Sequence, residues 1–224
     1  MLQEGFVYIK KVIPNLIESI RYAETENFLG CKVDGYLKPI GICTVQAAES
    51  LLKVSNLLKS DYSLVLYDAY RPVKAVKHFC RWSLNIKDDV KRLEYFPFIT
   101  KEQIVSLGFV STGRSKHSLG SAIDLSLVPK GSSLTALQKS PRTLTNGQNI
   151  LFLDDGTLDM GVSFDYFGDA ALTETNRVSI EAQKNRMILK QAMESCGFKN
   201  YKNEWWHFDL IENPHEDDFD FDVA

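Results

Sequence analysis

Two histidines and one aspartate of this sequence have the side chains that a catalytic metal site uses. His117 lies in a loop rich in glycine and serine, SKHSLGSAID, and Asp124 closes that segment. His207 lies much further along the chain, in EWWHFD. A catalytic zinc ion commonly takes three ligands from His, Asp, Glu or Cys and keeps a fourth position for water. The three side chains can supply that set, and a loop that doubles back through Gly120 can bring His117 and Asp124 to one point. The ordinary alternatives are a hydrogen-bonded loop histidine and a solvent-facing aspartate.

Glu204 and Arg71 are the candidates for acid–base and electrostatic catalysis. Glu204 stands three residues before His207, where a carboxylate can act as the general base for a zinc-activated water. A regular strand places positions three apart on opposite faces, so we expect Glu204 at the start of the strand on an irregular backbone. Arg71 follows a predicted strand and can stabilise the oxyanion that forms when water attacks a peptide carbonyl. The alternatives are an exposed glutamate and a structural salt bridge.

Other kinds of site fit this sequence poorly. The chain has no H-E-x-x-H helix, G-x-S-x-G elbow, phosphate-binding loop or Gly-rich dinucleotide fingerprint. The formal net charge is −3 and the Lys and Arg residues form no basic stripe, so we expect no nucleic-acid partner. The sequence likewise gives no reason to expect a membrane partner.

Hydrophobic periodicity and capping residues define the elements that must hold these side chains. Residues 44–59 read as a helix with Thr44 as its N-cap, and residues 61–70 read as a strand rich in β-forming residues. Pro72 can open a helix over 73–84. The later elements are a short helix with a Thr100–Gln103 capping box that ends near Gly108, a strand over 121–128, a helix over 179–196 capped by Gly197, and a strand over 204–211.

The strand over 121–128 alternates, so Ile123, Leu125 and Leu127 are expected to face the core and Asp124 the opposite side. Strands and helices mix without regular βαβ alternation. We therefore predict an α+β fold of one domain over residues 1–224, with a small, largely antiparallel sheet flanked by helices.

The segments that connect and end these elements are polar. Residues 129–169 read as loops with short extended pieces, and residues 212–224 read as an acidic surface tail, partly pinned by Phe219 and Phe221. No apolar run is long enough for a membrane span. The chain reads as cytoplasmic, although an exported protein whose signal peptide had been removed would look the same.

Five segments resemble the VanX-type D-alanyl-D-alanine dipeptidases, a branch of the zinc D,D-peptidases. The resemblance runs in order from about residue 5 to residue 222. The broader group has the pattern S-x-H-x-x-G-x-A-x-D followed by E-x-x-H, and the remaining contexts point to the dipeptidase branch. The segments are VDGY (33–36), YDAYRP (67–72), SKHSLGSAIDLSL (115–127), MGVSFDYF (160–167) and EWWHF (204–208).

This resemblance implies one zinc ion per chain, with His117, Asp124 and His207 as its ligands. Glu204 would be the general base and proton shuttle, and Arg71 would stabilise the tetrahedral intermediate. Three further positions match family residues near the substrate. Ser115 and Asp165 would contact it, with Asp165 holding its ammonium group, and Tyr36 matches an aromatic position near the pocket.

The resemblance implies hydrolysis of the small-molecule dipeptide D-Ala-D-Ala to two D-alanines, in a closed pocket that pairs both charged ends of the substrate. Two alternatives remain. One is a D,D-carboxypeptidase or endopeptidase that acts on peptidoglycan stems, and the other is a catalytically silent metal-binding module. The oligomeric state and the biological role are left open.

Overall fold

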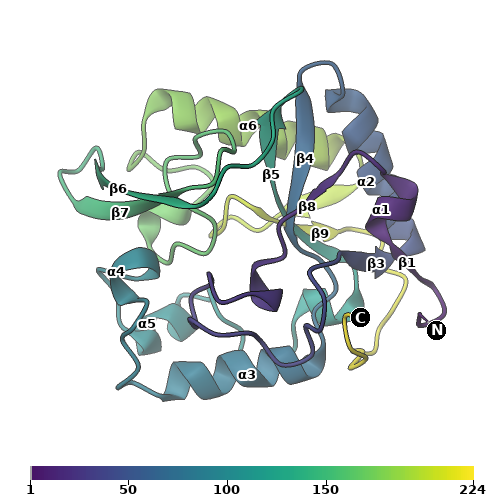
Figure 1. Ribbon diagram of the computed structural model, residues 1–224, viewed down its shortest axis with the longest axis horizontal. Helices are drawn as coiled ribbons and strands as arrows, with labels where there is room; N and C mark the ends of the chain where they lie inside the picture. Colours follow the sequence, from purple (N-terminus) through teal and green to yellow (C-terminus); the bar gives the residue numbers. More distant parts are fainter. Residues whose placement is uncertain (1) are drawn as a thin grey trace.

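A five-stranded sheet forms the centre of the computed structural model, which describes residues 2–224 (Figure 1). The strands are β1 (Phe6–Tyr8), β2 (Ile17–Glu18), β3 (Ile42–Thr44), β4 (Tyr62–Asp68), β5 (Ala122–Pro129), β6 (Gln138–Thr143), β7 (Asn149–Asp154), β8 (Phe198–Asn200) and β9 (His207–Leu210). The helices are α1 (Ile9–Val12), α2 (Val45–Leu58), α3 (Val73–Leu84), α4 (Arg92–Tyr95), α5 (Lys101–Ser106) and α6 (Ile180–Ser195).

The strand order of the central sheet is β2-β4-β5-β9-β8. β2 pairs with β4 in parallel, whereas the β4–β5, β5–β9 and β8–β9 pairs are antiparallel. The predicted α+β class with a largely antiparallel sheet is therefore confirmed. Because β9 inserts beside β5, residues that are far apart in the sequence become neighbours in the middle of the sheet.

The segment predicted as loops with short extended pieces contains a regular hairpin, β6–β7. Its turn contains Asn146 and Gly147, and Gly147 has a φ of 85°, a conformation that glycine adopts without steric cost. An Asn-Gly pair between two potential strands is a strong hairpin signal, and the sequence interpretation did not use it.

The helices begin where their capping residues predict. The Thr44 hydroxyl accepts a hydrogen bond from the Ala47 amide at 3.2 Å, and the predicted capping box at the start of α5 is present. Pro72 is the N-cap of α3 rather than its first helical residue. Gly197, with a φ of 92°, lies one residue beyond the Cys196 C-cap of α6.

Both faces of the central sheet are covered. α2 and α6 pack side by side, whereas α3, α4 and α5 lie on the other side of the molecule (Figure 1). Ile123, Leu125 and Leu127 are fully buried as predicted, but Asp124 on the opposite face is also only 2% exposed. A buried carboxylate is costly unless charged or hydrogen-bonding groups surround it, so its neighbours define a special site.

The acidic tail crosses the loops that follow β4 and precede β5. The Phe221 ring stacks on Tyr70 at 4.0 Å, and Phe219 packs edge-on against Phe6 at 4.9 Å. The Phe219 amide also donates a hydrogen bond to the Ser118 carbonyl at 2.9 Å. The expectation that both phenylalanines pin the tail is confirmed.

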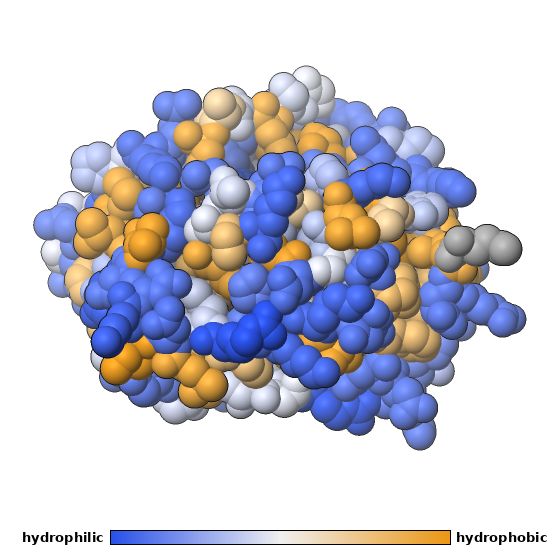
Figure 2. Space-filling model, turned by 60° about the horizontal axis from the view of Figure 1, so that its bottom comes forward, coloured by the Kyte–Doolittle hydropathy of each residue, from blue (hydrophilic) through white to orange (hydrophobic). Residues whose placement is uncertain are grey.

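No helix within residues 2–224 has the length and apolar character needed to cross a membrane. On the face shown in Figure 2, apolar side chains are interspersed among hydrophilic ones. The most exposed apolar residues near α3 and α4 are Leu84, Val90 and Leu93.

Candidate active site

The candidate metal ligands converge where β5 pairs with β9. Asp124 on β5 lies directly opposite His207 on β9. His117 reaches them from a single 3-10 turn, Lys116–Leu119, that ends at Gly120. Gly120 has a φ of 72°, and a Cβ there would lie 2.2 Å from the Phe6 ring. Glycine thus permits the sharp turn that returns the chain to the sheet, as expected.

The donor atoms of the three candidate ligands lie close together. His117 Nε2 lies 3.1 Å from His207 Nδ1 and 3.3 Å from Asp124 Oδ2, and His207 Nδ1 lies 3.0 Å from Asp124 Oδ1. Atoms about 2.0–2.1 Å from a tetrahedral zinc ion would lie about 3.3 Å apart. The spacing of these donors therefore fits a metal ion.

The outer ring nitrogens of both histidines have acceptors that fix their tautomers. His117 Nδ1 lies 2.7 Å from the Ala69 carbonyl oxygen, which can only accept. His207 Nε2 lies 3.1 Å from Asp209 Oδ1. In the neutral rings, His117 Nε2 and His207 Nδ1 then direct their lone pairs at one another and at Asp124. A cation at the centre would satisfy these lone pairs, and hydrogen-bonded outer nitrogens are typical of metal-binding histidines.

Glu204 lies in a turn just before β9, not within a strand. Its amide donates to the Tyr201 carbonyl at 3.0 Å, and its carbonyl accepts from the His207 amide at 3.3 Å. This turn brings Glu204 Oε2 to 3.8 Å from His207 Nδ1, so the two side chains are neighbours despite their spacing. Burial raises the pKa of Glu204 to about 8, although the nearby His207 opposes the shift. A pKa near neutrality suits a group that both takes and returns a proton.

Arg71 is held rigidly at the edge of the same site. Its Nε lies 2.9 Å from Asp68 Oδ2, and its Nη2 lies 3.4 Å from Asp124 Oδ2. Its guanidinium also faces the rings of Tyr22 and Phe79 at 5.2 and 4.9 Å. Burial opposes the charge, but the neighbouring carboxylates raise the pKa of Arg71 well above its ordinary value. The result is a permanent, oriented positive charge beside the candidate metal ligands.

Asp165 is a buried carboxylate that has, among residues 2–224, a single hydrogen-bonding side-chain partner. It is 4% exposed, and its two oxygens lie 3.1 and 3.0 Å from the Tyr22 hydroxyl. Its φ of 62° is unusual for a residue other than glycine. Burial raises the pKa of Asp165 well above its ordinary value, and the negative charge of Asp124 adds to the shift. A cationic ligand would relieve this unfavourable environment.

Seven of the eight candidate residues line one cavity of about 200 Å³, namely Arg71, Ser115, His117, Asp124, Asp165, Glu204 and His207. Tyr36 does not line it. The Tyr36 hydroxyl instead donates a hydrogen bond to Asp68 Oδ1 at 2.6 Å, so Tyr36 acts on the site through the carboxylate that orients Arg71. A direct contact of Tyr36 with substrate stays a prediction.

Three residues of the site were missed in the sequence interpretation. Asp68 stands three residues before Arg71 in YDAYRP, and Asp209 stands two residues after His207, where a strand returns to the same face. These two spacings could have indicated that Asp68 and Asp209 belong to the site. Tyr22, the partner of Asp165, had no such signal because the two residues lie in distant segments.

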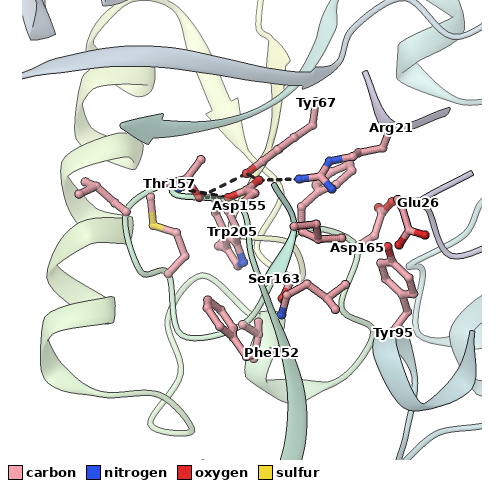
Figure 3. Close-up of a pocket in the computed structure, with 16 residues that line it drawn as sticks. Arg21, Glu26, Tyr67, Tyr95, Phe152, Asp155, Thr157, Ser163, Asp165 and Trp205 are labelled. Atoms are coloured by element: carbon pink, nitrogen blue, oxygen red, sulfur yellow. Dashed lines mark hydrogen bonds and ion pairs between the residues drawn. The ribbon is translucent and has the colours of Figure 1, made fainter. Parts of the chain in front are cut away.

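A second cavity adjoins the first and shares Asp165 (Figure 3). Its volume is about 20 Å³, roughly the room for one water molecule. Asp155 dominates one side of it, accepting hydrogen bonds from Arg21 Nη2 at 2.6 Å and from the Tyr67 hydroxyl at 2.7 Å. The cavity is too small for a dipeptide, so the larger one with the metal-ligand cluster is the candidate substrate site.

Two histidines and an aspartate around one point, beside a buried glutamate and an oriented arginine, are the features of a metallopeptidase. A comparison with known sequences agrees. Residues 2–224 match the sequence model of the D-ala-D-ala dipeptidase family, and the chain belongs to this family of metallopeptidases. The family resemblance and the assignment as an enzyme are thereby confirmed.

The curated relatives are similar over essentially their full length. The D-alanyl-D-alanine dipeptidase of Enterococcus faecium is 33% identical, covering 99% of this chain and 100% of the relative. That of Enterococcus faecalis is 31% identical with 100% of both chains covered, and that of Streptomyces coelicolor is 30% identical with 98% of both covered. The similarity therefore extends through the whole fold.

Proposed function

We propose that this chain hydrolyses D-Ala-D-Ala to two D-alanines at a zinc site formed by His117, Asp124 and His207. The observation that carries the proposal is the convergence of these three side chains at the wall of one cavity that also contains Glu204 and Arg71. The names of the relatives support the choice of substrate.

The donor set is suited to zinc. Two imidazole nitrogens and one carboxylate leave a fourth position open, as catalytic zinc sites require. A zinc ion bound there would polarise the scissile carbonyl and lower the pKa of a water molecule. The residues of the chain then orient the substrate and move the protons.

Glu204 is the proposed proton shuttle. It takes a proton from the attacking water as the new C–O bond forms, and it delivers that proton to the amine as the peptide C–N bond breaks. Its position beside His207, in a buried turn, places its carboxylate next to the metal ligands. General acid–base catalysis of this kind typically contributes about 10²- to 10⁴-fold in rate.

Arg71 is the proposed stabiliser of the oxyanion that develops on the scissile carbonyl. Its ion pair with Asp68 holds the guanidinium in place before substrate binds, so little reorganisation is needed as charge develops. The hydrogen bond from the Tyr36 hydroxyl to Asp68 helps to hold the Asp68 carboxylate, and through it Arg71, in position.

Asp165 and Ser115 are the proposed substrate contacts. Asp165 is buried at the cavity wall and has no Lys or Arg within ion-pair distance among residues 2–224, which favours the free ammonium group of a dipeptide. A D,D-carboxypeptidase or endopeptidase would meet an uncharged amide at this position. The environment of Asp165 thus favours the dipeptidase over these alternatives.

The test compares D-Ala-D-Ala with a tripeptide that ends in the same pair, using purified, zinc-loaded protein. We expect efficient cleavage of the dipeptide only, and one zinc ion per chain by elemental analysis. His207→Ala should lose most of the zinc, whereas His78→Ala, outside the site, should keep it. Equal kcat/KM for both peptides would indicate a carboxypeptidase, and zinc binding without any turnover would indicate a silent binding module.

A further inference from the structure

The outer hydrogen bonds of the two proposed histidine ligands differ. His117 donates to a backbone carbonyl, that of Ala69, which cannot be changed by a side-chain substitution. His207 donates instead to a side chain, the carboxylate of Asp209, at 3.1 Å. A charged acceptor generally makes a stronger hydrogen bond than a neutral one, although the bond to Asp209 is the longer of these two.

Asp209 is well placed to hold this ring. It lies two residues after His207 on β9, so both side chains are on the same face of the sheet. Its backbone is paired on both sides, opposite Ala122 of β5 and Lys199 of β8. The carboxylate therefore projects from an interior strand of the sheet that is paired on both sides.

Asp209 is not itself a member of the ligand cluster. It faces Nε2 of His207, whereas the cluster contains Nδ1 on the other edge of the ring. Asp209 thus contacts the His207 ring at Nε2, whereas His117 and Asp124 contact it at Nδ1.

We infer that Asp209 is a positioning residue for the metal: by accepting the hydrogen bond from His207 Nε2, it holds the His207 ring with Nδ1 directed at the ion. The inference rests on the proposed zinc site. Without this acceptor, the ring is free to rotate about its side-chain bonds or to exchange tautomers, and the inner nitrogen is no longer presented to zinc in advance. Loss of such an outer partner typically weakens metal binding by about 10- to 100-fold.

Asp209 also lines the substrate cavity, with a side chain that is 34% exposed. A direct contact with the substrate is therefore the competing explanation. The two explanations differ in what they change. A positioning residue alters zinc affinity, whereas a substrate contact alters KM at saturating zinc.

The experiment measures zinc affinity by competition with a chromophoric chelator, for wild type, Asp209→Ala and Asp209→Asn. We expect about 10- to 100-fold weaker zinc binding for the alanine variant and a smaller loss for asparagine, which keeps an acceptor oxygen but not the charge. Asp217→Asn, which removes one exposed acidic charge from the tail, is the matched control and should bind zinc like wild type. In excess zinc, both Asp209 variants should recover wild-type KM for D-Ala-D-Ala and wild-type circular dichroism.

Wild-type zinc affinity with a raised KM in Asp209→Ala would overturn the inference and assign Asp209 to the substrate. A loss that excess zinc does not restore in either variant would also overturn it, because it would indicate a role in folding. If wild type bound no zinc, or if His207→Ala bound zinc as tightly as wild type, the proposed metal site itself would fail.

Discussion

Replacing Asp165 with asparagine tests how the site selects a free dipeptide. The Asp165 carboxylate is buried, and the Tyr22 hydroxyl is its only hydrogen-bonding side-chain partner among residues 2–224. Asparagine has nearly the same size and keeps one acceptor oxygen for Tyr22, so the change removes the charge with little change in shape.

The expected loss follows from the interaction that the substrate would make. A hydrogen bond to a charged group contributes about 1.5–3 kcal/mol, and each 1.36 kcal/mol is a factor of ten. The kcat/KM for D-Ala-D-Ala should therefore fall about 10- to 150-fold in Asp165→Asn. Most of the change should appear in KM, because the ammonium group is bound in the ground state and in the transition state alike.

The assay compares D-Ala-D-Ala with N-acetyl-D-Ala-D-Ala, which has no ammonium group. Wild type should strongly prefer the free dipeptide, since the acetylated one leaves a buried carboxylate without a charged partner. Asp165→Asn should lose most of this preference. Asp61→Asn, an exposed substitution of the same kind outside the site, should retain it. An unchanged preference in Asp165→Asn would refute the assignment of Asp165 to the ammonium group.

Three further substitutions test the rest of the site. Glu204→Gln should keep its zinc but lower kcat by about 10²- to 10⁴-fold, and near-normal turnover would mean that another group activates the water. Arg71→Lys should lower kcat at least about tenfold in the same assay, because one ammonium cannot contact Asp68 and the oxyanion in the geometry of the planar guanidinium; an equal kcat would exclude Arg71 from oxyanion stabilisation. Gly120→Ala should lower the free energy of unfolding by about 2 kcal/mol or more in urea titrations, since it combines a positive φ with a 2.2 Å contact to the Phe6 ring. Gly147→Ala, with a similar φ and no atom within 4 Å, should cost less, and equal losses would contradict this account.

Local signals predicted the elements well. The strand around β4, the N-cap Thr44, the capping box of α5 and the alternating apolar residues of β5 all depend on neighbours within a few positions, and the structure has them close to the expected boundaries. The hairpin β6–β7 was missed because β6 is polar and mostly exposed, so it lacks the hydrophobic alternation that marks a half-buried strand, although its partner β7 is apolar and partly buried.

The candidate site depended on a different kind of information. The motifs around His117 and His207 indicated which residues to consider, but only the pairing of β5 with β9 shows that Asp124 and His207 are opposite each other. Likewise, the contact between Tyr22 and Asp165 joins positions 143 residues apart. Long-range register of this kind cannot be read from local periodicity.

The position of β9 between β5 and β8 also determines when the site can assemble during folding. His117 and Asp124 are synthesised long before His207, and β9 must pair with β5 before all three side chains meet. A metal ion bound by all three side chains would then stabilise the pairing of β9 with β5. A nascent or partly folded chain, in which this pairing is absent, would have no peptidase activity.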